Sequence, residues 1–138
     1  MKLTFLCSDC RCWLIRNPSE LPTGCSSRYE WAGSKQQAGD LGSALIGIGA
    51  AFEMSEIMLG SDEFCNSFAS EWLVATSSVL MHVLSDMGSV DDSVYIYHKT
   101  VAILSKIGDE VDMKRLMPKL AKSARDARWK DNYARVLH

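Results

Sequence analysis

From about residue 35 onward, apolar side chains recur every three or four positions, which is the spacing of one face of an α-helix. The pattern is interrupted at Gly60, Gly88 and Gly108, and glycine commonly ends a helix. It therefore predicts four helical stretches, at residues 35–59, 61–87, 89–107 and 109 to near the C-terminus. Pro118 is expected either to kink the last stretch or to begin a new helix there.

The second stretch has the longest apolar stripe. This stripe is predicted to face the core through Phe64, Phe68, Trp72, Ala75, Val79, Val83 and Met87. The first stretch instead repeats small side chains every four residues, at Gly39, Ser43, Gly47 and Ala51. Such a strip lets a second helix approach closely, either from the same chain or from a second copy in a twofold dimer. Close packing would compensate for the cost of a helical glycine, about 1 kcal/mol relative to alanine.

The first 34 residues show a different pattern, with side chains that alternate between apolar and polar as they do along a β-strand. We expect strands at residues 2–7 and 10–16, joined by a loop at Ser8-Asp9, and a third short strand at 25–31. The predicted fold is mainly α. A bundle of about four helices occupies residues 35–138, and a small cysteine-rich β-hairpin or three-stranded meander occupies residues 1–34.

Composition supports an ordinary globular protein: of the 138 residues, 47% are hydrophobic and 23% are charged. The longest uncharged apolar stretch runs from Leu41 to Phe52, shorter than the roughly 18 residues that span a bilayer, so we expect no membrane partner. The apolar stretch in the first residues is too short for a secretion signal, because the charged Asp9 and Arg11 follow at once. With five cysteines, an odd number, we expect reduced thiols and a cytoplasmic location.

Four of the five cysteines lie in the first 25 residues, at Cys7, Cys10, Cys12 and Cys25. Cys7 and Cys10 have the spacing of one half of a zinc ribbon, and Cys25 follows at the right distance for the second half. The fourth ligand position holds Arg28, so Cys12 would have to complete a tetrahedral site. The alternative is that the thiols are small buried hydrophobic groups, which the hairpin register favours because Cys7, Cys10 and Cys12 would share a face with Phe5. No other cofactor is indicated.

Charge is divided unevenly along the chain. Residues 114–138 carry eight lysines and arginines against two aspartates, although the whole chain has a net charge of −2. A basic helix with aromatic side chains can bind phosphates and stack on bases, or it can contact an acidic protein surface. The candidate contact residues are Lys119, Lys122, Arg125, Arg128, Trp129 and Tyr133. The net acidic chain favours pairing with the protein's own acids, such as Asp112.

The sequence contains no pattern that indicates catalysis. His82 and His98 stand at neither metal nor triad spacing, and no phosphate-binding loop or nucleophile elbow appears. We therefore expect a non-catalytic protein–protein interaction module, an adaptor, inhibitor or regulator, that binds another protein or a second copy of itself as a homodimer. The alternative is a nucleic-acid-binding protein that uses the basic C-terminal helix, with a zinc-stabilised N-terminal hairpin.

Overall fold

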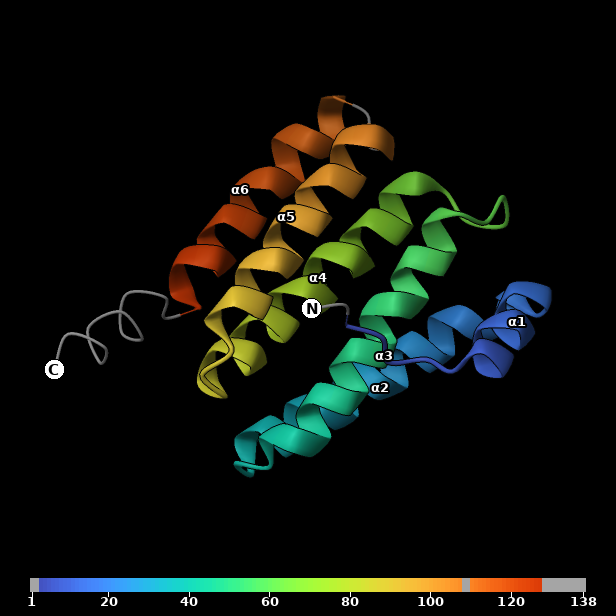
Figure 1. The fold of residues 1–138 in the computed structure, drawn as a ribbon. Coiled ribbons are helices and arrows are strands. Elements are labelled where there is room, and N and C mark those ends of the chain that lie inside the picture. The colour runs from blue at the N-terminus through green and yellow to red at the C-terminus, as the bar shows by residue number, and fades with distance from the viewer. Residues whose placement is uncertain (1–2, 108–109, 128–138) are drawn as a thin grey trace, which may run out of the picture.

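The computed structural model describes residues 3–107 and 110–127, and these are mainly helical, which confirms the predicted α class. Six α-helices and one short 3-10 helix make up the described part of the chain (Figure 1). Their bounds are α1 Ser8–Arg16, η1 Pro18–Glu20, α2 Leu21–Gln37, α3 Leu41–Leu59, α4 Asn66–Asp86, α5 Val90–Ile107 and α6 Glu110–Asp126.

The predicted N-terminal β element is wrong, because α1 and α2 occupy those residues and the described part of the chain has no strand. Cys7 caps α1: its Sγ accepts a hydrogen bond from the backbone N–H of Cys10 at 3.3 Å. Pro22 lies in the first turn of α2, where backbone N–H groups have no acceptor within the helix, so the missing N–H of proline breaks no helical hydrogen bond. Leu21 and Cys25, four residues apart, are fully buried, so the inward spacing in α2 is helical and not alternating.

The single helix expected at residues 35–59 is two helices. α2 ends at Gln37, and Gly39 adopts a positive φ of 81°, a conformation that favours glycine. Asp40 then caps α3, since its Oδ1 accepts a hydrogen bond from the N–H of Ser43 at 3.2 Å. The boundary predicted between the two parts, at residue 34, lies inside α2. At the other end of the chain, α6 continues through Pro118.

The helices pack in an order that follows the chain (Figure 1). α2 packs along α3, α3 along α4, and α4 also contacts α5 and α6, so α4 is the central helix. α3 has the length and apolar composition of a membrane span, but 61% of that segment is buried inside the protein. Burial of this kind is what a core helix of a globular fold also shows.

The apolar stripe predicted for the second helical stretch does not fully match the buried face of α4, because α4 is the central helix. Phe68 and Met87 are exposed, whereas the neighbouring Ala69, Leu73 and Leu80 are fully buried. A helix with neighbours on several sides buries a wide face, so a single stripe does not describe it. Small side chains with hydroxyl groups occupy part of that face. The Oγ1 atom of Thr76 lies 3.2 Å from the Oγ atom of Ser55 on α3.

Candidate partner-binding groove

An extended N-terminal segment, residues 3–6, is held against α3 by one buried carboxylate. Glu53 is only 4% exposed. It accepts hydrogen bonds from the backbone N–H groups of Phe5, at 3.0 and 3.1 Å, and of Leu6, at 2.8 Å. The guanidinium of Arg11 on α1 completes the set at 2.9 Å. A buried carboxylate is tolerated because these donors replace its water.

Gly49 makes this close approach possible. A Cβ atom at Gly49 would lie 2.2 Å from the ring of Phe5, far inside van der Waals contact. The N-terminal segment therefore crosses α3 where the helix has no side chain. Together, Gly49 and Glu53 fix the start of α1 against the C-terminal half of α3.

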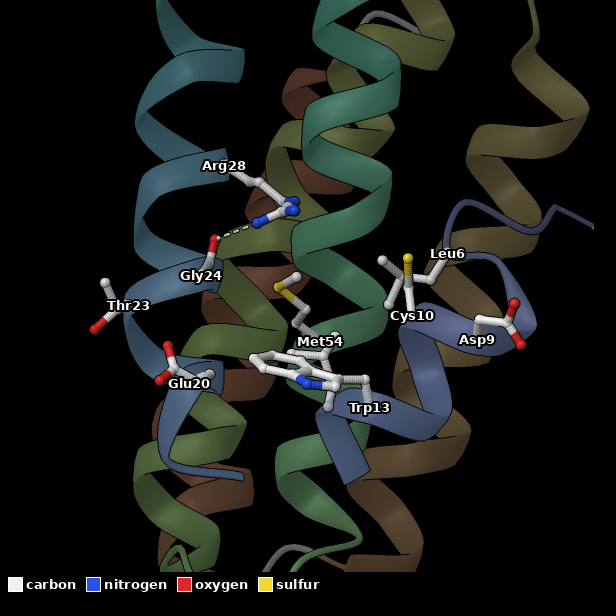
Figure 2. A pocket seen from close by; sticks show the side chains of 10 residues that line it. Leu6, Asp9, Cys10, Trp13, Glu20, Thr23, Gly24, Arg28 and Met54 are labelled. Atoms are coloured by element: carbon white, nitrogen blue, oxygen red, sulfur yellow. Dashed lines mark hydrogen bonds between the residues drawn. The ribbon is translucent and has the colours of Figure 1, made fainter. Parts of the chain in front are cut away.

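This placement of α1 leaves a groove between α1, α2 and α3 with a volume of about 450 Å³. Such a volume lies within the range of ligand pockets in proteins, about 300–1,000 Å³. Figure 2 shows Trp13 extending from α1 toward α2, close to Met54 of α3. Trp13 is 49% exposed, whereas Leu14 and Met54, which also line the groove, are buried. The groove thus has an apolar floor and one large aromatic side chain that remains accessible to solvent.

The edge of the groove is polar and mainly acidic. Glu20 and Thr23 stand on the α2 side, and Asp9 stands at the start of α1 (Figure 2). Arg28 supplies the cation of the lining, and its Nη1 donates to the carbonyl of Gly24 at 3.4 Å. Neither Asp9 nor Glu20 forms an ion pair with another residue of the described ranges. Two carboxylates at the edge are therefore available to a basic ligand.

The four N-terminal cysteines are not arranged around a common point. Cys7, Cys10 and Cys12 are exposed on α1, whereas Cys25 is buried in α2. Burial raises the pKa of Cys25 to about 12. Hydrogen bonds from the thiol and the backbone N–H of Cys10 lower the pKa of Cys7, and the same contact raises the pKa of Cys10.

Across residues 3–107 and 110–127, no three histidine, cysteine or acidic side chains lie where they could hold a metal ion. The expected hairpin, which would have put three thiols on one face, is replaced by a helix. Zinc remains a prediction from sequence alone, and metal analysis of protein purified without added zinc tests it.

The basic residues of the C-terminal region divide into two groups. Lys119, Lys122 and Arg125 are exposed on α6, and none has an ion pair with a residue that the structure describes. Arg128, Trp129 and Tyr133 lie outside the described residues. Arg115, also on α6, pairs within the protein: it contacts Glu71 and, at 3.1 Å, Asp112.

The small residues of the predicted strip have different surroundings. A Cβ atom at Gly47 would lie 2.7 Å from Trp31 and 3.4 Å from Ala32, both on α2. The carbonyl of Ala51 accepts a hydrogen bond from the thiol of Cys25, also on α2, at 3.5 Å. Gly39 ends the turn before α3 and has open space around it, and Ser43 is half-buried in the first turn. The middle of the strip therefore faces α2 of the same chain.

Sequence reasoning missed the groove itself, because its walls depend on α1 and α2 being helices. A usable signal was present in Glu53, a charged residue between the apolar Phe52 and Met54 in a largely apolar helix. A charge at an inward position predicts a buried polar contact. Comparison with protein-family models, with curated proteins and with solved structures found no match to this chain.

Proposed function

We propose that this protein is a non-catalytic interaction module, an adaptor, inhibitor or regulator, that binds a segment of a partner protein in the groove between α1, α2 and α3. The observation that carries this proposal is the groove of about 450 Å³ with the half-exposed indole of Trp13 over buried Met54. Accessible aromatic side chains beside an apolar pocket are the usual anchors of protein interfaces.

The charges at the edge indicate the chemistry of the partner. Asp9 and Glu20 have no ion pair among the described residues, while the guanidinium of Arg28 lies close to a backbone carbonyl. A segment with apolar side chains on one face and lysine or arginine beside them would complement both the floor and the edge. We therefore propose an amphipathic basic segment as the occupant.

A substitution that fills the groove tests this proposal. The exposed Thr23 lines the groove, and Thr23→Trp places a large ring in it. Ser27→Trp is the matched control, because Ser27 is exposed one turn later on α2 and does not line the groove. The probes are a helical leucine–lysine peptide and the same peptide with glutamate in place of lysine.

We expect the leucine–lysine peptide to bind the natural protein and the Ser27→Trp variant, and to bind Thr23→Trp at least tenfold more weakly. The leucine–glutamate peptide should bind the natural protein more weakly, because it meets Asp9 and Glu20. Equal binding to both tryptophan variants would contradict the proposal. A dimer in solution that Thr23→Trp disrupts would instead identify a second copy of the chain as the occupant.

The second candidate function is nucleic-acid binding through α6. It is favoured by the exposure of Lys119, Lys122 and Arg125 without ion pairs to described residues. If these side chains contact phosphates, the affinity for duplex DNA should fall with salt with a log–log slope of about −0.9 per phosphate neutralised. Changing Lys122, Arg125 and Arg128 together to glutamine should then abolish binding. Negligible binding by the natural protein at physiological salt would reject this candidate.

A further inference from the structure

A second cavity, separate from the partner groove, lies between α2 and α4 and has a volume of about 380 Å³. Tyr29 lines it from α2, and Phe68, Trp72, Glu71 and Ala75 line it from α4. Three of these five side chains are aromatic, and one is a carboxylate. The combination of aromatic rings with a single acid is characteristic of sites for alkylated cations.

The rings have the mutual orientation that such a site requires. Tyr29 and Trp72 stand almost perpendicular, at 78°, with their centroids 5.8 Å apart, so they form two adjoining walls. Phe68 forms a third side and is 40% exposed. The ring of Phe64 lies near that of Phe68, with centroids 6.2 Å apart, but Phe64 does not line the cavity.

The carboxylate of Glu71 is the acidic group in the cavity lining. Its side chain is 54% exposed, and its Oε1 contacts Nη1 of Arg115. Arg115 also donates to Asp112 at 3.1 Å, so this guanidinium is shared between two acids. Within the described part of the chain, Oε2 of Glu71 accepts no hydrogen bond and forms no ion pair. This oxygen is free to face a ligand.

We propose that this aromatic cavity binds a small quaternary ammonium ligand of the choline type, with the cationic centre against the rings and near Glu71. The negative faces of aromatic rings attract a cation whose alkyl groups also gain from apolar contact. A neutral ligand of the same shape would keep the apolar contact and lose the attraction. The proposal does not depend on a protein partner in the other groove.

The test compares three probes on the intact protein: choline, its uncharged isostere 3,3-dimethylbutan-1-ol, and ethanolamine. Nuclear magnetic resonance of the indole N–H groups reports binding, and the signal of Trp72 is assigned with Trp72→Phe. We expect choline to shift this signal and to bind at least fivefold more tightly than the isostere, the factor that corresponds to a cation–π contribution of about 1 kcal/mol. Ethanolamine, which lacks the methyl groups, should bind more weakly than choline.

Two variants locate the binding site. Phe68→Leu keeps an apolar side chain but removes a ring from the cavity, and it should weaken choline binding severalfold. Phe64→Leu is the matched control, which should leave choline affinity within about twofold. Glu71→Gln should weaken choline and leave the isostere unchanged, which keeps the proposal testable if Phe68→Leu fails to fold. Equal affinities for choline and the isostere, equal losses in both phenylalanine variants, or no response of Trp72 at tens of millimolar choline would each overturn the proposal.

Discussion

Replacement of Glu53 by alanine should be among the most destabilising single changes in this protein. The carboxylate accepts from the backbone N–H groups of Phe5 and Leu6 and from Arg11, at distances between 2.8 and 3.1 Å. In Glu53→Ala, the N–H of buried Leu6 is left without its acceptor, which costs about 1–3 kcal/mol. The side chain of Arg11 is 39% exposed and can hydrogen-bond to water instead, so the loss of its ion pair with Glu53 adds little to the cost.

The loss of packing adds to this cost. Without its anchor the segment at residues 3–6 can detach from α3, and the contacts of Phe5 and Leu6 are then lost. The variant adopts whichever state costs less free energy: a bound segment with an unpaired Leu6 N–H, or a detached segment. We expect the free energy of unfolding to fall by about 3 kcal/mol in total. For a chain of this length that corresponds to a fall in Tm of about 10 °C.

Urea unfolding followed by circular dichroism measures this loss, and hydrogen exchange of the Leu6 amide reports the segment directly. Glu30→Ala is the control, because Glu30 is exposed on α2 and should change stability by no more than about 0.5 kcal/mol. Glu53→Gln keeps an acceptor without the charge and should give an intermediate loss. A loss below about 1 kcal/mol in Glu53→Ala, with the Leu6 amide still protected, would refute the anchoring role.

Three further predictions concern single side chains. Gly49→Ala should cost about 1–2 kcal/mol because the new Cβ meets Phe5, whereas Gly42→Ala, with open space around it, should be neutral or stabilising in urea unfolding. Burial raises the pKa of Glu56 despite Lys99 at 3.4 Å, so its carboxyl favours the folded state at low pH and loses that contribution as pH rises through the raised pKa. Glu56→Gln should therefore be more stable than the natural protein near pH 7, and its advantage should disappear in acid; an unchanged difference across pH would contradict this. Iodoacetamide, followed by peptide mass spectrometry, should modify Cys7 faster than Cys10, and Cys25 only on unfolding; early modification of Cys25 would show that it is not buried.

The helices after residue 40 could be predicted from the sequence because their signals are local. Gly88 adopts a positive φ of 82° after α4, as a helix-ending glycine does, and the apolar spacing identified α3 to α6. The buried face of α4 differs from the predicted stripe because the burial of a side chain depends on how many neighbours its helix has. That number is a property of the assembled fold and not of the local sequence.

The N-terminal region could not be read in this way, because its signals conflict. Leu3 and Phe5 alternate as in a strand, and they do lie in an extended segment, but its acceptor is Glu53, almost fifty residues away. Leu21 and Cys25 carry a helical spacing that the turn residues Pro22 and Gly24 obscure. The groove depends on both features, so its lining became visible only in three dimensions.

The most direct measurement of the proposed function is a titration of the protein, labelled at its methionine methyl groups, with the leucine–lysine helical peptide. Met54 forms the floor of the groove beside Trp13, so its Cε methyl signal reports occupancy of that site. We predict a saturable shift of the Met54 signal that Thr23→Trp abolishes and Ser27→Trp preserves. A peptide that binds without moving the Met54 signal, or that moves it equally in both variants, would contradict a partner site between α1, α2 and α3.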